Sequence, residues 1–260
     1  MMKVKIVKLN VSAKKSQKTT DYVAEEEPLY IFLNRTHYAT IFCSPSNHKE
    51  LAVGHVLSEG IVKSIEEIED ISLKEKCVCR IRLKPNVKLQ KRLKLSKPFS
   101  RVILSACGST APYQYSGKLL KIASDLKIRA EVILESVRRL NFIAETFRKT
   151  GGVHVAALYK SDGTLLAFAE DVGRHNAVDK INGIGALNKI DFGECFLAVS
   201  GRLTGDMVLK AVRLGIPIVA SLAAAVDSGI AAAKKANLTL AGFVRGNRMN
   251  IYSFPERIIA

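Results

Sequence analysis

Short apolar runs alternate with longer helix-favouring segments through the second half of the chain. Glycines and polar residues separate the two kinds of segment, as they do in α/β proteins. The pattern predicts strands at Val153–Tyr159, Leu165–Ala169, Cys195–Ser200, Ile216–Ser221, Leu238–Val244 and Met249–Tyr252, and helices at Asn176–Leu187, Thr204–Leu214 and Asp227–Ala236. Apolar strands joined by helices indicate an α/β domain whose sheet is buried on both faces.

One further helix is expected before the first of these strands. Ile133, Val137, Leu140, Ala144 and Phe147 recur at spacings of four, three, four and three residues. This spacing places them on one face of an amphipathic helix. The glycines at 151 and 152 are expected to end it.

The first hundred residues follow a different pattern. Residues 1–20 predict an edge strand and a mobile loop, and Leu29–Asn34 with Tyr38–Ser44 predict a hairpin. A helix is expected to start near Asn47 and end at Gly60. The character of the chain changes after Pro98, so we place a boundary near residue 100, with a small α+β region at 1–100 and the α/β domain at 101–260.

Residues 76–84 alternate in polarity as a half-exposed strand does. Cys77, Cys79, Ile81 and Leu83 share one face, and the opposite face is largely basic. Residues 74–97 hold ten basic residues and one acidic residue. Two interpretations are open: an edge that contacts anions, or a charged edge that blocks aggregation, and the second is slightly favoured.

The composition narrows the class of protein. Hydrophobic residues make up 48% of the 260 residues, enough for a sizeable core, and the formal net charge is +16. This charge suits an anionic partner, although general solubility explains it equally well. Five cysteines make a poor disulfide framework. The sequence has no signal peptide and no run of about 20 apolar residues, so we expect a cytoplasmic protein without a membrane partner.

A phosphate site is one interpretation of residues 200–204. An apolar strand runs into Ser200-Gly201-Arg202 and then into a helix. Such a turn exposes backbone N–H groups at the positive end of the helix dipole, Gly201 permits close approach, and Arg202 can add a bidentate contact. The same arrangement also occurs without a ligand, so the motif alone favours neither interpretation.

Two arginines flank a turn near the C-terminus. Gly246-Asn247 lies between Arg245 and Arg248 and follows an apolar strand. Gly-Asn is an ordinary hairpin signal. Two arginines at such a tip would also clamp a pyrophosphate.

The segment EDVGRHNAVDK (170–180) is unusually polar for the entrance to a helix. Asn176 is expected to cap that helix, with Asp179 as the acid of a capping box. His175 with Glu170 and Asp171 would form an acid–base group. A structural hydrogen-bonding role for His175 is the more frequent case.

Cys107 is the candidate nucleophile. It ends the apolar strand predicted at Arg101–Ala106 and precedes a loop of small residues. That position is more accessible than the middle of a strand, and nearby cations would stabilise its thiolate. Cys77 and Cys79 are interpreted as core residues, and the sequence lacks the cysteine and histidine spacing of a zinc site.

Several segments together resemble the formate dehydrogenase accessory sulfurtransferase family, FdhD. They are GGVHVAAL (151–158), EDVGRHNAVDK (170–180), SGRLTGDMVLKA (200–211), GIP (215–217) and LAGFVRGNRMNIYSFPERI (240–258), and LAVGHVLSEGIV (51–62) resembles the N-terminal region of the family. The similarity spans most of the chain, and the order of the motifs is specific.

The resemblance implies a cytidine-deaminase-like three-layer α/β domain without the deaminase zinc, and a smaller strand-rich N-terminal region. It implies that Cys107 takes sulfur from a cysteine desulfurase as a persulfide. The sulfur then passes to the bis-molybdopterin guanine dinucleotide cofactor, with molybdenum or tungsten, of the formate dehydrogenase catalytic subunit. It further implies a homodimer and no metal bound directly by the protein.

The resemblance also assigns cofactor-binding residues. The C-terminal binding stretch of the family matches Phe243, Val244, Arg245, Gly246, Asn247 and Arg248. With Ser200, Gly201 and Arg202, we expect Arg174 and His175 to shape a ligand pocket at the strand–helix switch. We expect His175 and its acidic neighbours to shape this pocket rather than to perform catalysis.

Three departures from the family pattern leave a second function open. The reactive loop of the family reads CGxCG, and here Thr110 replaces the second cysteine. Asp206 stands where the family has Glu, and residues 221–229 depart from its Ser-Ala-Pro-Thr pattern. The alternative is a binding module or chaperone for the pterin guanine dinucleotide that has lost sulfur transfer. Nucleic-acid binding rests on charge alone, and we expect no specific nucleic-acid partner.

Overall fold

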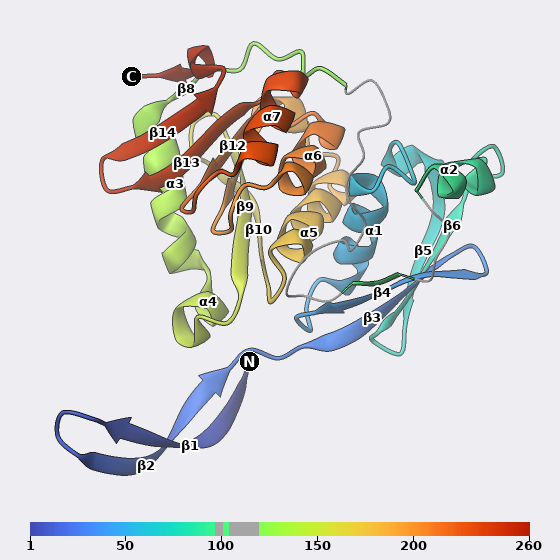
Figure 1. Cartoon of the computed structure of the whole chain (residues 1–260). Helices are drawn as coiled ribbons and strands as arrows, with labels where there is room; N and C mark the ends of the chain where they lie inside the picture. Colours follow the sequence, from blue (N-terminus) through green and yellow to red (C-terminus); the bar gives the residue numbers. More distant parts are fainter. Residues whose placement is uncertain (97–100, 104–119) are drawn as a thin grey trace.

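The chain begins with a two-stranded hairpin that projects from the rest of the molecule (Figure 1). The computed structural model describes residues 1–96, 101–103 and 120–260. Strands β1 (Met2–Asn10) and β2 (Lys15–Val23) pair antiparallel over their full length. The predicted mobile loop is therefore wrong, because Thr19, Thr20 and Tyr22 favour extended backbone and complete the second strand.

A five-stranded sheet forms the N-terminal region, in the order β5-β6-β3-β4-β7. Its elements are β3 (Glu27–Leu33), β4 (Thr36–Cys43), α1 (His48–Ser58), η1 (Ile65–Glu67), β5 (Ile68–Lys74), β6 (Val78–Leu83), α2 (Leu89–Ser96) and β7 (Arg101–Ile103). The predicted β3–β4 hairpin and the alternation of β6 are confirmed: Cys79 and Ile81 are buried and Arg80 is exposed.

The α/β domain contains a six-stranded mixed sheet in the order β10-β9-β11-β12-β13-β14. Its strands are β9 (His154–Lys160), β10 (Leu165–Asp171), β11 (Cys195–Val199), β12 (Ile218–Ser221), β13 (Thr239–Arg245) and β14 (Arg248–Ser253). The helices are α3 (Ala130–Ile143), α4 (Glu145–Thr150), α5 (Arg174–Leu187), η2 (Phe192–Glu194), α6 (Gly205–Leu214), α7 (Asp227–Ala236) and η3 (Pro255–Arg257). The short strands β8 (Ile128–Arg129) and β15 (Ile258–Ile259) pair with each other.

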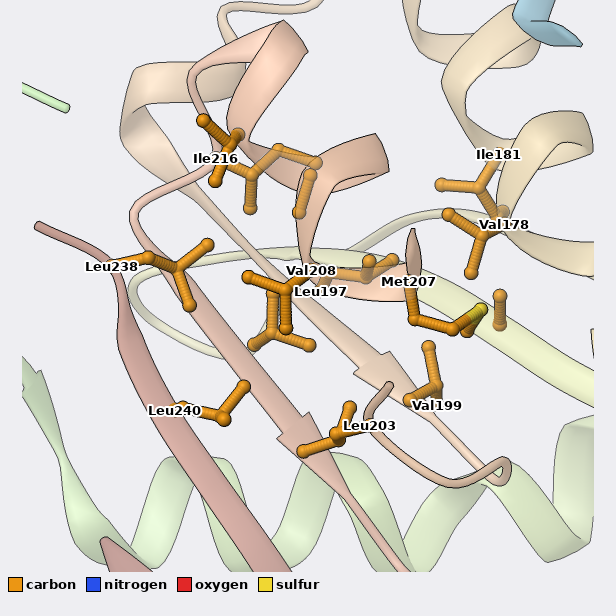
Figure 2. Packing of buried hydrophobic residues seen from close by; sticks show 14 of the residues in the cluster. Val178, Ile181, Leu197, Val199, Leu203, Met207, Val208, Ile216, Leu238 and Leu240 are labelled. Carbon is orange, nitrogen blue, oxygen red and sulfur yellow. The ribbon is translucent and has the colours of Figure 1, made fainter. Parts of the chain in front are cut away.

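Helices cover both faces of this sheet, so the expected three-layer α/β fold is confirmed (Figure 1). On one face, α5 and α6 pack Val178, Ile181 and Met207 against strand residues such as Leu197 (Figure 2). Helix α3 covers the other face and buries Ile133, Val137 and Leu140 there. The single helix expected through Phe147 is wrong, because the backbone turns to extended geometry at Ala144 and α4 starts anew.

The two regions meet where helix α1 packs against helix α5 with the two backbones in contact. A Cβ at Gly54 would lie 1.7 Å from the Asp179 carbonyl oxygen, and one at Gly183 would lie 1.8 Å from the Glu50 carbonyl oxygen. The backbones of the two helices can therefore touch only because both positions are glycine. The boundary expected near residue 100 falls outside the described residues and stays a prediction. Among the residues described, no helix has the length and apolar character needed to cross a bilayer.

Candidate functional site

A hollow of about 400 Å³ opens at one edge of the six-stranded sheet. The parallel strands β11, β12 and β13 all end at this edge, whereas the antiparallel strand β9 begins there and β10 returns to it. The hollow is lined by Phe147, Gly151, Gly152, Val153, His154, Val172, Ser200, Leu222 and Ala223. This is the strand–helix switch at which open α/β sheets commonly bind ligands.

Two of the predicted motifs meet beside the hollow. A Cβ at Gly201 would lie 3.0 Å from Arg174 Cβ and 3.3 Å from its Cδ, so Arg174 packs directly over the glycine. Arg174 Nε is buried and has no hydrogen-bond partner among the described residues. A buried guanidinium N–H without an acceptor costs free energy unless a ligand or water satisfies it.

His154 and Ser200 form the wall next to Arg174. Ser200 Oγ accepts a hydrogen bond from Val155 N at 3.0 Å and lies 3.4 Å from His154 Nδ1. Burial, with the charges of Arg174 and His175, lowers the pKa of His154, so the neutral imidazole is favoured. His154 was not among the residues predicted from the sequence, although a polar side chain at the start of the apolar strand β9 was the available signal.

His175 pairs with Asp206 and not with Glu170 or Asp171, so the predicted acid–base group is wrong. His175 Nε2 lies 2.5 Å from Asp206 Oδ2, because the first turn of α5 directs the ring toward α6. Burial alone would raise the pKa of Asp206, but hydrogen bonds from His175, Thr204 and Met207 N hold it well below its usual range. The pair places the anionic Asp206 carboxylate next to the His175 ring.

The two acids expected beside His175 have structural partners instead. Glu170 accepts hydrogen bonds from Thr146 N at 3.2 Å and Phe147 N at 2.6 Å, and so caps α4. Asp171 is fully buried, lies 2.7 Å from Lys180 Nζ and accepts a bond from Ser44 N at 3.0 Å. These contacts fix the rim of the hollow and attach it to β4.

The predicted capping box at Asn176 is also wrong. Helix α5 begins at Arg174, with Gly173 at the N-cap position. Asn176 Nδ2 donates to the Phe42 carbonyl and to Asp171 Oδ1, both at 2.9 Å. Asp179 lies 2.8 Å from Lys210 Nζ and 3.1 Å from His55 Nδ1. Asn176 therefore links α5 to the N-terminal region, and Asp179 links α5 both to that region, through His55, and to α6, through Lys210.

The arginine turn forms the tip of the β13–β14 hairpin. Phe243 has a φ of 51° at a bulge in β13, and its N–H donates to the Ala223 carbonyl in the wall of the hollow. Val244 is 1% exposed and faces the core. Gly246 and Asn247 make the exposed turn between Arg245 and Arg248, which are both exposed, and the Arg245 guanidinium lies 5.3 Å from the centre of the Phe243 ring.

The segment after β12 connects this hairpin to the Ser200-Gly201-Arg202 turn. Ser221 Oγ donates to the Gly201 carbonyl at 2.6 Å, and Leu203 N donates to the Ala224 carbonyl at 2.9 Å. Arg202 is exposed beside this junction. The structure thus brings Arg174, Ser200 and Gly201 together, with Phe243 across one wall and Arg245 and Arg248 farther out on the tip.

Cys107 lies outside the described residues. Burial raises the pKa of Cys43 and Cys79 to about 12 and that of Cys195 to about 11, so none of these three is a ready thiolate. Cys77 is half-buried, and burial also raises its pKa. Within the described ranges, no group of three or more His, Cys, Asp or Glu side chains is arranged to hold a metal ion.

Comparison with known proteins gives consistent matches. The model of the FdhD/NarQ family matches residues 24–259. The chain is 40% identical to a sulfur carrier protein FdhD from Sulfolobus acidocaldarius, covering 98% of both chains. It is 38% identical to a sulfur carrier protein FdhD from Saccharolobus solfataricus, covering 96% of both. A crystal structure described as that of a formate dehydrogenase accessory protein from Desulfotalea psychrophila has a TM-score of 0.81 at 27% identity, covering 99% of both chains.

Proposed function

The chain belongs to the FdhD/NarQ family, and from that premise we propose that it is a sulfur carrier that serves formate dehydrogenase. In this proposal Cys107 accepts sulfur as a persulfide from a cysteine desulfurase. It passes the sulfur to the molybdenum or tungsten bis-molybdopterin guanine dinucleotide cofactor. Relatives named as sulfur carrier proteins and the formate dehydrogenase accessory protein support the sulfur-carrier role.

The observation that carries the proposal is the contact between Arg174 and Gly201. The buried Arg174 Nε lacks an acceptor among the described residues, and the missing side chain at the buried Gly201 lets this arginine pack directly on the backbone of a strand–helix turn. A phosphate oxygen supplies the acceptor that this nitrogen needs, and arginine suits phosphate better than lysine does. These residues fit the nucleotide phosphates of the acceptor, with the exposed Arg202, Arg245 and Arg248 as further cations.

The position of β7 supports a sulfur step near the same edge. Strand β7 ends at Ile103, four residues before Cys107, and runs parallel to β4. Beyond the end of β4, Ser44 Oγ accepts a hydrogen bond from Val172 N, and Val172 lines the hollow. The two strands therefore end on the side of the N-terminal sheet that contacts the rim.

The first chemical step follows from thiol chemistry. The Cys107 thiolate attacks the outer sulfur of the donor persulfide, a new S–S bond forms at Cys107, and the donor cysteine leaves as its thiolate. A single cysteine is sufficient for this exchange, so Thr110 in the reactive loop does not prevent it. The Cys107 thiolate is regenerated when a nucleophilic electron pair of the acceptor attacks the outer sulfur: the acceptor–sulfur bond forms, the S–S bond breaks, and the acceptor is formally oxidised by two electrons.

Mass spectrometry of the intact protein tests this function. After incubation with a cysteine desulfurase and cysteine, we expect a mass increase of one sulfur atom, removable by reductant and located on Cys107. Cys107→Ala should remain unmodified, whereas the matched variant Cys77→Ala should load normally. Equal loading of Cys107→Ala would contradict the assignment of Cys107.

The same experiment separates the second candidate function. A binding module for the pterin guanine dinucleotide is favoured by the replacement of the second loop cysteine by Thr110. Saturable binding of GDP, used as a fragment of the cofactor, together with no sulfur on Cys107 would establish that function. Sulfur on Cys107 would exclude it.

A further inference from the structure

The β1–β2 hairpin presents an exposed face with one sign of charge. Side chains alternate between the two faces of a strand, and the register pairs Lys3 with Tyr22, Lys5 with Thr20, Val7 with Lys18 and Leu9 with Ser16. All eight of these side chains are exposed, and Val7 and Leu9 are 64% and 66% exposed. We call these eight residues the arm face; it combines three lysines with apolar side chains and has no acid.

The β1–β2 hairpin lacks the support that a two-stranded sheet usually needs. A two-stranded sheet is marginally stable alone in water, and within the described part of the chain β1 and β2 pair only with each other. Their outer edges therefore carry backbone groups available to another protein strand. The family model begins its match at residue 24, after the hairpin, so the arm lies outside the part of the chain that carries the candidate site.

The hairpin starts at the rim of the hollow. A Cβ at Gly152 would lie 3.1 Å from Ala24 Cβ, and Lys149 Nζ lies 5.4 Å from the centre of the Tyr22 ring. Gly152 lines the hollow, and Lys149 belongs to α4 beside it. A protein that contacts the arm face near Tyr22 would therefore also lie against the opening of the site.

We propose that the arm face docks the protein that donates sulfur to this carrier, through an acidic surface of that donor. The inference rests on the proposed function. The acceptor cofactor is a small molecule whose phosphates the residues beside the hollow can contact, whereas the donor sulfur sits on a protein side chain and needs a protein-sized contact outside the hollow. Three lysines without an acid select an acidic surface, and the apolar side chains supply buried area.

Charge argues against a second copy of the chain as the occupant. The segment 1–23 holds six lysines and one aspartate, and the whole chain carries a formal net charge of +16. Two copies would bring like charges together at the arm, which disfavours association. Nucleic acid would satisfy the lysines but would leave the apolar side chains and the strand edges without complementary partners.

Sulfur loading from two kinds of donor tests the docking role. The arm variant carries Lys3→Glu, Lys5→Glu and Lys18→Glu. The matched control carries Lys84→Glu, Lys88→Glu and Lys91→Glu, the same charge change at exposed positions on the α2 side of the molecule (Figure 1). Loading of Cys107 is measured with a cysteine desulfurase of the same organism and, separately, with inorganic polysulfide as a small donor.

We expect the arm variant to need about tenfold more desulfurase for half-maximal loading, because charge reversal at an interface weakens the encounter. Its loading by polysulfide should match the wild type, and the control should behave normally with both donors. A second variant, Val7→Ser with Leu9→Ser, should weaken desulfurase loading at any ionic strength.

Three results would overturn the proposal. One is equal desulfurase loading by the wild type and the arm variant, and another is an equal loss in the control. The third is an arm variant that loads sulfur from the desulfurase at the wild-type rate but has lost another interaction. That interaction would be self-association, measured by sedimentation, or binding to a single-stranded RNA. If neither donor loads Cys107 in the wild type, the sulfur-carrier function itself is contradicted. This result differs from the three above, which contradict only the docking role of the arm face.

Discussion

The two ends of residues 174–180 lie in opposite surroundings, although both carry charged side chains. At the start of α5, Arg174 packs on Gly201 beside the hollow, and its Nε has no acceptor within the described residues. One to two turns later, Asp179 and Lys180 are 1% and 0% exposed, and each is held in an ion pair with a short N–O distance. The first end has an unmet hydrogen-bonding requirement, and the second has its charges paired.

The difference shows which polar residues of a motif hold the fold and which serve a ligand. Lys180 Nζ bonds Asp171 together with the Ser44 and Glu170 carbonyls, so it fastens β4 to the α/β domain. Arg174 instead packs on Gly201, and its buried Nε–H has no acceptor among the described residues. Substitutions at the paired end should change stability, and substitutions at the open end should change binding.

The largest expected effect is at the paired end. Lys180→Met would leave the Asp171 carboxylate buried without its cation, which costs about 3–5 kcal/mol. We expect a decrease of this size in the free energy of unfolding, measured by urea denaturation. The control Lys234→Met removes an exposed lysine from α7 and should change stability by less than about 0.5 kcal/mol. A decrease in unfolding free energy as small as that of the control would contradict a structural role for the Lys180–Asp171 pair.

A second prediction concerns the contact between Gly201 and Arg174. In Gly201→Ala the new methyl group would lie 3.0 Å from Arg174 Cβ, so the arginine must shift by a few tenths of an ångström. We expect GDP binding to weaken about tenfold, or about 1.4 kcal/mol, with a smaller change in stability. Gly193→Ala, whose Cβ would meet only an Asp191 carboxylate oxygen at 3.3 Å, should bind normally. Normal GDP binding by Gly201→Ala would show that this contact does not shape the site.

The smallest effect is a pH dependence from His154. Burial lowers its pKa in the folded protein, so the unfolded chain takes up this proton at the higher pH. Stability is therefore lost as the pH falls below the ordinary histidine value of about 6.5. Urea denaturation at a series of pH values should show that the free energy of unfolding falls less steeply with falling pH in His154→Gln than in the wild type. The difference between the two slopes should be less than about 1.4 kcal/mol per pH unit. Identical pH profiles of the wild type and His154→Gln would contradict the burial of His154.

The fold was largely predictable because its strands are apolar throughout and its helices are periodic. The pattern identified β9 to β14 and the helices between them, and it placed the Ser200-Gly201-Arg202 turn at a strand–helix junction. It failed where partners distant in sequence decide the outcome. Asn176 resembles a cap, but its amide bonds Phe42, and His175 stands close to two acids in sequence but pairs with Asp206. No local pattern reports such contacts.

The most direct test of the central claim is calorimetric titration of GDP into the wild type and Arg174→Met. The account predicts one saturable site per chain in the wild type and at least about tenfold weaker binding in the variant, with unchanged unfolding free energy. Arg138→Met, which removes a guanidinium whose side chain is 70% exposed on α3, should bind as the wild type does. Equal affinity in all three proteins would contradict a phosphate site at the open end of α5.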